Sequence, residues 1–384
     1  MAVIFMHKRA IWIVLAAILS LFVYNEFLVY YIVLLQCHWP QLDDGRADLD
    51  ITPTSRLPLK AMIMSDTHLL GSREGHWFDR LRREWQMERS FQTALTLFNP
   101  EVIFVLGDLF DEGKWCSDRE FKYYVKRFSK MFRHSSHNDM HILVGNHDIG
   151  FHSMIEDDKL KRFYRTYSVE SAKMVRLKDN IFVSLNSMAF EGDRCDMCQE
   201  AMQSLNIIAG TLDCAKFYFQ HGNEDPSCGD TTFPYTRPIL LQHFPMYRTS
   251  DSNCTGIDSA PPDMKNDPFM PKWDCLSKEA SEKILRQIKP RMIFAGHTHN
   301  FCYHEHVDHT PEWTLASFSW RYKSTPSFLL VTISNNNQAV KKCYLPSEVT
   351  VVYTYVIGAI IIIAWIVLPK KFYGYRPPSV EKSR

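Results

Sequence analysis

Short apolar runs recur along the middle of the chain, and each is followed by an Asp, Asn or His. Five runs have this pattern: Met62–Met64, Val102–Leu106, Ile142–Val144, Ile239–Gln242 and Met292–Ala295. Runs of this length and composition predict buried β-strands. Open α/β proteins place their functional site at the carboxyl ends of the strands. We therefore expect the polar residues after the five runs to share one site.

The segments between these runs have the apolar spacing of helices. From Trp77 to Phe98 apolar residues recur along one side, and Asn99-Pro100 ends the stretch. Further helices are predicted over 117–132, 157–167 and 277–288, and further strands over 59–65, 140–144, 181–185, 238–242, 327–333 and 339–344. Strands alternate with helices early and dominate late. This order predicts an α/β fold with two sheets face to face and helices outside.

Both ends of the chain carry long apolar segments. Residues 11–35 and 349–368 each reach the roughly 20 residues that cross a bilayer. The first segment has no small-residue cleavage site, which favours an anchor over a cleaved signal peptide. The second is apolar on all faces, which favours a span over a buried core helix. Asn25 and Glu26 interrupt the first segment and are interpreted as a polar pair that faces a neighbouring helix.

Basic residues give the orientation of the two spans. Lys8-Arg9 precedes the first span and Lys370-Lys371 follows the second. The positive-inside rule then places residues 1–10 and 369–384 in the cytosol. A polar stem over 36–58 and a domain over 59–345 are expected in the lumen. The net charge of +1 gives no reason to expect nucleic acid as a partner.

The cysteines fit the same orientation. All ten lie between residues 37 and 343, where an oxidising lumen would let them pair. Four lie in a polar segment over 191–237 that is interpreted as an insertion: Cys195, Cys198, Cys214 and Cys228. Zinc binding and two disulfides are both open for these four, and the lack of a second C-x-x-C favours disulfides. Cys37 and Cys343 each lie beside a span, which predicts a disulfide between them, and Asn253-Cys254-Thr255 is a glycosylation acceptor.

The residues at the strand ends form a set of metal ligands. The set is Asp66, His68, Asp108, Asn146, His243, His297 and His299. Imidazole and carboxylate groups without sulfur suit Mn, Fe or Zn in an open site. Two such ions close together would activate water and neutralise charge on phosphoryl oxygens. The sequence therefore predicts a dinuclear hydrolase.

The order of these blocks resembles the calcineurin-like metallophosphoesterase superfamily. The blocks are Asp66-x-His68, Gly107-Asp108-x-x-Asp111, Gly145-Asn146-His147-Asp148, His243 and Gly296-His297-x-His299. The resemblance implies a four-layer α/β/β/α sandwich. It implies that one metal takes Asp66, His68 and His299, that the other takes Asn146, His243 and His297, and that Asp108 bridges them. It also implies that His147 faces the phosphate, that Asp148 orients its ring, and that Asp111 supports the site without binding metal.

Other strings resemble one membrane-anchored subfamily that remodels glycosylphosphatidylinositol (GPI) anchors. They include Gly75-His76-Trp77, Phe110–Trp115, His147–His152 and Ser317–Arg321. The resemblance implies a Mn²⁺ phosphodiesterase that removes the ethanolamine phosphate from the second mannose. It also implies a multi-pass protein of ER exit sites, the ER–Golgi intermediate compartment and the cis-Golgi. Its partners would be GPI-anchored proteins, the bilayer and cargo-sorting machinery.

Two other functions remain open at this point. The same chemistry could act on another membrane substrate or on a phosphoprotein, although the two spans favour a membrane-bound substrate. The fold could also serve as a non-catalytic scaffold, but such scaffolds usually lose ligands and none is missing here. The tail ends Val380-Glu381-Lys382-Ser383-Arg384, which lacks a full dilysine pair. A retrieval signal and an ordinary basic tail are therefore both open.

Overall fold

The computed structural model describes residues 8–42, 57–192, 196–222, 228 and 233–368. These residues fall into two compact units. One contains the two apolar terminal helices, and the other spans Tyr30–Pro346. The predicted cytosolic tail, the first seven residues, most of the stem and Cys195 lie outside the described residues.

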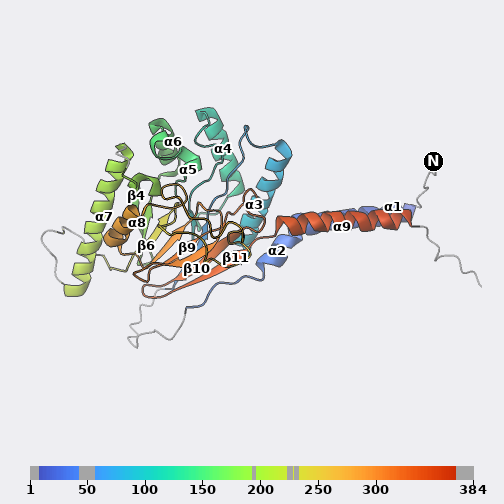
Figure 1. Ribbon diagram of the computed structural model, residues 1–384. Coiled ribbons are helices and arrows are strands. Elements are labelled where there is room, and N and C mark those ends of the chain that lie inside the picture. Colours follow the sequence, from blue (N-terminus) through green and yellow to red (C-terminus); the bar gives the residue numbers. More distant parts are fainter. Residues whose placement is uncertain (1–7, 43–56, 193–195, 223–227, 229–232, 369–384) are drawn as a thin grey trace, which may run out of the picture. The chain divides into compact units, whose positions relative to one another are not determined.

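The larger unit contains two mixed sheets (Figure 1). The first has the strand order β11-β10-β1-β2-β3, and the second β4-β5-β6-β7-β9-β8. The strands of the first sheet are β1 (Leu59–Met64), β2 (Val102–Val105), β3 (Asp139–Ile142), β10 (Ser327–Ile333) and β11 (Gln338–Tyr344). Those of the second are β4 (Ala172–Leu177), β5 (Asn180–Leu185), β6 (Ile239–Gln242), β7 (Met292–Ala295), β8 (Cys302–Glu305) and β9 (Pro311–Thr314).

The strands that end in candidate ligands are parallel to their neighbours. β1 pairs in parallel with β2, and β2 with β3. β6 pairs in parallel with both β5 and β7. The carboxyl ends of β1, β2 and β3 therefore lie along one edge of the first sheet, and those of β6 and β7 along one edge of the second.

Alternate residues of these strands enter two different hydrophobic clusters. Ala61 and Ile63 of β1 share a cluster with Ile239 and Leu241 of β6, across the two sheets. The residues between them point to the other face, as the twofold period of a strand requires. Met62 of β1 and Leu240 of β6, for example, belong to the cluster that also includes residues of the helices. Both faces of each sheet are therefore covered, which gives the predicted four layers.

Helices supply the two outer layers. They are α3 (Trp77–Phe98), α4 (Asp118–Met131), the single-turn α5 (Asn146–Ile149), α6 (Asp157–Tyr167), α7 (Asp196–His221) and α8 (Lys278–Ile288). The start of α4 carries a capping box, in which Ser117 and Glu120 satisfy each other's backbone amides. The left-handed residue Asn99 ends α3, as the Asn-Pro pair predicts. The predicted bounds of α3 and α6 match the structure.

Some predicted elements need correction. The described part of the segment over 191–237 contains the 26-residue helix α7, which was not predicted. Strands β4, β8 and β9 were not predicted. β3 was expected to reach Val144 but ends at Ile142, because the chain leaves the sheet toward α5.

Disulfides connect distant parts of the larger unit. Cys37 and Cys343 are bonded, with a Cα separation of 5.7 Å, which confirms the predicted pair. Cys214 pairs with Cys228, and Cys198 is also disulfide-bonded. Disulfides rather than zinc therefore account for these three cysteines of the segment. Cys254–Cys302 is a further bond that the sequence did not indicate.

The smaller unit contains two helices with the length and composition of membrane spans. One runs over Lys8–Leu34, and its last turns extend into the larger unit; the other is α9 (Glu348–Val367). The first consists of α1 (Lys8–Val23), a π-helical turn (Tyr24–Leu28) and α2 (Val29–Leu34). Within this turn Glu26 accepts a hydrogen bond from Tyr355 of α9. The polar interruption therefore faces a neighbouring helix, as expected.

Candidate metal centre

The candidate ligands lie just after the carboxyl ends of five strands, in loops or, for Asn146, at the start of α5. β1 leads to Asp66 and His68, β2 to Asp108, β3 to Asn146, β6 to His243, and β7 to His297 and His299. Five of these seven have left-handed backbones, with φ between 44° and 75°: Asp66, His68, Asp108, His297 and His299. A non-glycine residue in this region is strained and persists only where its surroundings hold it. Such strain concentrated at the strand ends indicates a functional site.

Two glycines let these loops approach one another. A Cβ on Gly145 would lie 2.2 Å from Oδ1 of Asp108, so only glycine fits there. Gly107 has a φ of +101°, and a Cβ there would lie 2.8 Å from Nδ1 of His243. The two glycines therefore bring the ends of β2, β3 and β6 into contact.

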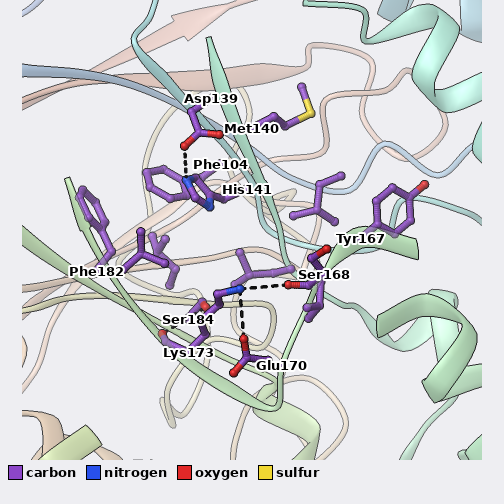
Figure 2. Close-up of a pocket in the computed structure, with 15 residues that line it drawn as sticks. Phe104, Asp139, Met140, His141, Tyr167, Ser168, Glu170, Lys173, Phe182 and Ser184 are labelled. Atoms are coloured by element: carbon purple, nitrogen blue, oxygen red, sulfur yellow. Dashed lines mark hydrogen bonds and ion pairs between the residues drawn. The ribbon is translucent and has the colours of Figure 1, made fainter. Parts of the chain in front are cut away.

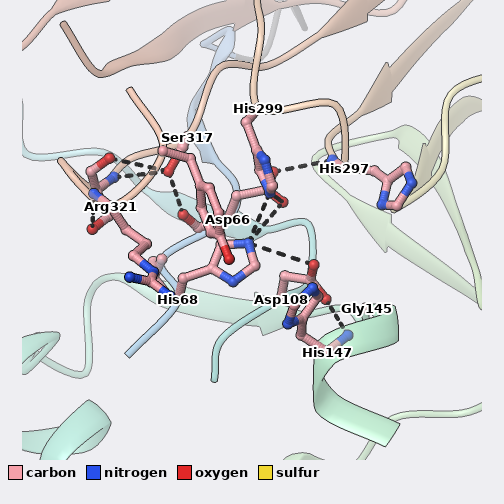
Figure 3. Close-up of polar contacts among 12 residues, drawn as sticks. Asp66, His68, Asp108, Gly145, His147, His297, His299, Ser317 and Arg321 are labelled. Atoms are coloured by element: carbon pink, nitrogen blue, oxygen red, sulfur yellow. Dashed lines mark hydrogen bonds and ion pairs between the residues drawn. The ribbon is translucent and has the colours of Figure 1, made fainter. Parts of the chain in front are cut away.

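The first group of ligands converges on one point (Figure 3). Nε2 of His68 lies 2.9 Å from Nε2 of His299 and 3.6 Å from Oδ1 of Asp66. Oδ2 of Asp108 is 3.5 Å from the same nitrogen of His68. One ligand atom from each of these four residues lies within 4.8 Å of the others. This arrangement suits a single cation.

The second group shares Asp108 with the first. Oδ2 of Asp108 lies 3.3 Å from Nε2 of His243, and the amide oxygen of Asn146 lies 3.1 Å from that nitrogen. Asp108, His243 and His297 again lie within the spacing of a metal site. The structure thus brings together all seven predicted residues. Asp108 lies between the two groups, where a bridging ligand would be.

Backbone carbonyls fix which nitrogen of each imidazole faces the centre. Nδ1 of His243 is 2.8 Å from the carbonyl oxygen of Leu106, and Nε2 of His297 is 2.6 Å from that of Trp273. A carbonyl oxygen only accepts, so each of these nitrogens carries a hydrogen. In the neutral form of each ring, the other nitrogen then has a lone pair that can bind metal.

Buried atoms without partners fit two cations. Among the described residues, Oδ1 of Asp66, Oδ2 of Asp108 and Nδ1 of His297 are buried and make no hydrogen bond. Such groups are costly to bury unless something binds them. All three belong to the two groups above. The residues present therefore fit a pair of divalent ions.

Carboxylates of the site raise the pKa of two of its histidines. Burial alone would lower the pKa of His68, but the hydrogen bond to Asp111 and the charges of Asp66 and Asp108 raise it to about 10. Burial likewise opposes protonation of His243, yet the charge of Asp108 raises its pKa to about 9. Burial would raise the pKa of Asp108, but the His243 and His147 charges hold it well below its usual range. The carboxylates that stabilise these protonated rings would also stabilise divalent cations bound in place of the protons.

The two histidines after β7 behave differently. Burial and the neighbouring His243 charge lower the pKa of His297 to about 4. Burial also lowers the pKa of His299 to about 3. Both rings are therefore neutral at physiological pH, which is the form that binds a metal.

His147 lies at the rim of the cluster, and its partner differs from the expected one. Nδ1 of His147 lies 3.0 Å from the carbonyl oxygen of Asp111, and 23% of its side chain is exposed. The carboxylate of Asp148 instead accepts hydrogen bonds from the backbone amides of Leu109, Phe110 and Gly145, at 2.9–3.1 Å. The expectation that Asp148 orients the His147 ring is therefore wrong, since Asp111 holds that ring.

We expect Asp148→Ala to destabilise the protein. Three buried amides would lose their acceptor, and an unsatisfied buried group costs about 1–3 kcal/mol. The free energy of unfolding should fall by about 2–4 kcal/mol, which lowers Tm by roughly 5–15 °C. Thermal melting in detergent would measure this. Asp139→Ala removes a carboxylate that is 64% exposed and should leave Tm unchanged. Equal melting of both variants would contradict the role assigned to Asp148.

Two further residues reach the cluster from the loop after the last block. The ring of Tyr322 stacks on His299 at 4.1 Å, and its hydroxyl donates to Oδ1 of Asp111 at 3.0 Å. One guanidinium nitrogen of Arg321 lies 3.1 Å from Oδ2 of Asp111. The string Ser317–Arg321 indicated this loop, but no sequence spacing connects it to Asp111.

A separate pocket lies between β3 and the β4–β5 hairpin. Its volume is about 350 Å³, and its lining includes His141, Tyr167 and Lys173 (Figure 2). Lys173 there contacts the carbonyl oxygen of Ser168 at 3.2 Å and Glu170 at 3.1 Å. None of the candidate ligands lines this pocket, so it is distinct from the metal centre.

Comparison with known proteins decides the family. The calcineurin-like phosphoesterase profile matches residues 59–301, which include every candidate ligand. The chain belongs to the calcineurin-like phosphoesterases. This phosphoesterase is similar to proteins called Metallophosphoesterase 1 along most of its length. It is 45% identical to that of Mus musculus, covering 88% of this chain and 84% of the relative. For Xenopus laevis the values are 44%, 92% and 87%, and for Danio rerio 44%, 90% and 88%.

Family, fold and ligand cluster together make this protein a metal-dependent phosphoesterase. The predicted superfamily and the α/β sandwich are confirmed. The identity of the metal, the substrate and the role of each site residue go beyond these findings.

Proposed function

We propose that this phosphoesterase removes the side-chain ethanolamine phosphate from the second mannose of GPI anchors. The observation that carries the proposal is a cluster of all seven candidate ligands in a chain that also has an apolar helix of spanning length near each end of its sequence. A substrate held in the same membrane would be confined near the site, which raises its effective concentration. GPI-anchored proteins are such substrates. Their export from the ER would then depend on this reaction.

The proposed reaction is hydrolysis of a phosphodiester. Water adds to phosphorus, the bond from phosphorus to the mannose oxygen breaks, and that oxygen takes up a proton. Two divalent ions, which we propose to be Mn²⁺, would supply Lewis acidity and an activated water. Asp66, His68 and His299 would hold one of them, and Asn146, His243 and His297 the other. Asp108 contacts both groups and would bridge them.

His147 would supply the proton. Its Nδ1 donates to the carbonyl oxygen of Asp111, so Nε2 is the ring nitrogen that can act on substrate. Burial lowers the pKa of His147, so the imidazolium is the minor form at neutral pH but a stronger acid than an exposed one. Its backbone amide donates to Oδ1 of Asp108 at 2.7 Å, which holds the backbone of His147 against the carboxylate of Asp108.

We also propose that the large unit lies in the lumen of the early secretory pathway. Three disulfides with both cysteines described hold it together: Cys37–Cys343, Cys214–Cys228 and Cys254–Cys302. Bonds of this kind persist in oxidising compartments. Asn253 of the glycosylation acceptor is exposed, so a glycan could be attached there. ER exit sites, the ER–Golgi intermediate compartment and the cis-Golgi are the proposed locations. Cargo-sorting machinery is a proposed partner.

The experiment is an analysis of GPI glycans from cells that lack the protein. The second mannose should carry excess ethanolamine phosphate, and export of GPI-anchored proteins should slow. Wild-type protein should reverse both effects, and the Asp108→Asn variant should reverse neither. A normal glycan and normal export would reject this substrate. Another membrane lipid or a phosphoprotein would then be the substrate of the same hydrolase.

A further inference from the structure

A carboxylate lies beside the metal centre on the side of Arg321. One guanidinium nitrogen of Arg321 lies 3.1 Å from Asp111 and 3.3 Å from Oε2 of Glu74. Asp111 in turn contacts both His68 and His147. Glu74 is therefore separated from the site only by one guanidinium group.

The buried side chain of Glu112 holds the backbone around Glu74 in place. Glu112 is fully buried, and its Oε1 accepts hydrogen bonds from the backbone amides of Arg73 and Glu74, at 2.9 and 2.7 Å. The hydroxyl of Tyr124 donates to the other oxygen of Glu112 at 3.1 Å. A Cβ on Gly71 would lie 2.0 Å from Glu112, so the loop wraps closely around that side chain. The Glu74 side chain keeps 44% of its surface exposed on this fixed loop.

The charge of Glu74 is unexpected at a site that binds phosphate. A carboxylate at this distance repels a phosphoryl group, and Arg321 offsets that repulsion only in part, since it also pairs with Asp111. A negative charge there is favourable when the substrate carries a positive charge next to its phosphate. An ethanolamine phosphate ester has this form, because a two-carbon arm joins its ammonium to its phosphate.

We propose that Glu74 binds the substrate ammonium and that Arg321 positions its carboxylate. This inference rests on the proposed function and names how the same site selects its substrate. Arg321 contacts Oε2, and a carboxylate has a second oxygen that can accept from an ammonium. The half-exposed ring of Tyr322 borders the same side of the site.

The test compares two soluble mannosides with the full-length enzyme in detergent with Mn²⁺. One carries ethanolamine phosphate and the other propyl phosphate, in which a methyl group replaces the ammonium. The wild-type enzyme should have the higher kcat/KM for the ammonium ester. Glu74→Gln keeps a hydrogen-bond acceptor for Arg321 but loses the charge. It should lower the ratio of the two kcat/KM values about fivefold, the effect of one partly exposed charge pair. Glu74→Asp should restore part of the ratio.

Glu282→Gln is the matched control. Glu282 pairs with Arg286 at 3.4 Å and its side chain is 47% exposed, but it lies on α8 and contacts none of the candidate ligands. Its ratio should equal that of the wild type. If Glu74 has a purely structural role, Glu74→Gln should lower kcat/KM for both esters by the same factor. The ratio of the two values would then be unchanged, which would overturn the inference. A wild-type enzyme without preference for the ammonium would do the same, while the proposed function would stand. If the wild-type enzyme hydrolyses a nitrophenyl phosphodiester but neither mannoside, the proposed substrate would be rejected as well.

Discussion

Asp108→Asn is expected to abolish phosphoester hydrolysis, with a fall in kcat of at least about 10³-fold. Oδ2 of Asp108 is the one carboxylate oxygen that lies within 3.5 Å of both His68 and His243 among the described residues. Loss of its charge should weaken both cation sites together. Metal analysis of the purified variant should find fewer than two ions per chain. Asn suits this test because, like Asp, it tolerates the left-handed backbone found at residue 108.

A second buried carboxylate provides the control for Asp108. Asp251 is 2% exposed and pairs with Arg248 at 2.8 Å, outside the cluster. Asp251→Asn should cost stability but retain two ions per chain and its activity at low temperature. Asp108→Asn with two ions and the wild-type rate would show that the ions are not bridged by this residue.

The sequence predicted the site better than the segments around it. The seven candidate ligands follow apolar strands whose length and composition are recognisable, so their convergence could be inferred from strand ends alone. Helix α3 was predicted because its apolar spacing and its terminator agree. In α7 the residues Met197, Ala201, Leu205, Ile208 and Leu212 are buried with helical spacing. The helical spacing of these residues was not recognised in the sequence, because cysteines and polar residues lie among and around them.

Contacts between distant loops could not be predicted in the same way. Nothing in the sequence connects Asp111 with Arg321 and Tyr322, which lie more than 200 positions away. The partner of His147 could not be predicted from its motif either. The adjacent Asp148 accepts backbone amides, and the His147 ring instead contacts the carbonyl oxygen of Asp111. The left-handed backbones at five ligands are not visible in residue types, because Asp and His usually occupy ordinary regions.

His147→Gln should lower kcat about 10²–10³-fold on an alkyl phosphodiester while two ions remain bound. The ring lies at the rim and contacts the ligand His68 only edge to face, at a centroid distance of 4.8 Å. The substitution should therefore leave the candidate ligands in position and remove a proton donor. The size of the effect should depend on the leaving group. A nitrophenolate leaves without a proton, so a nitrophenyl phosphodiester should lose less than about tenfold.

His141→Gln is the control for this leaving-group test. His141 is similarly exposed, at 26%, and pairs with Asp139 at 3.1 Å away from the cluster. It should match the wild type on both substrates. Equal losses for His147→Gln on the alkyl and nitrophenyl esters would mean that His147 binds the phosphoryl group without donating a proton. Loss of metal from His147→Gln would instead mean that its contact with Asp111 supports the candidate ligands, because Oδ1 of Asp111 lies 3.2 Å from Nδ1 of His68 and 3.6 Å from Nδ1 of His147.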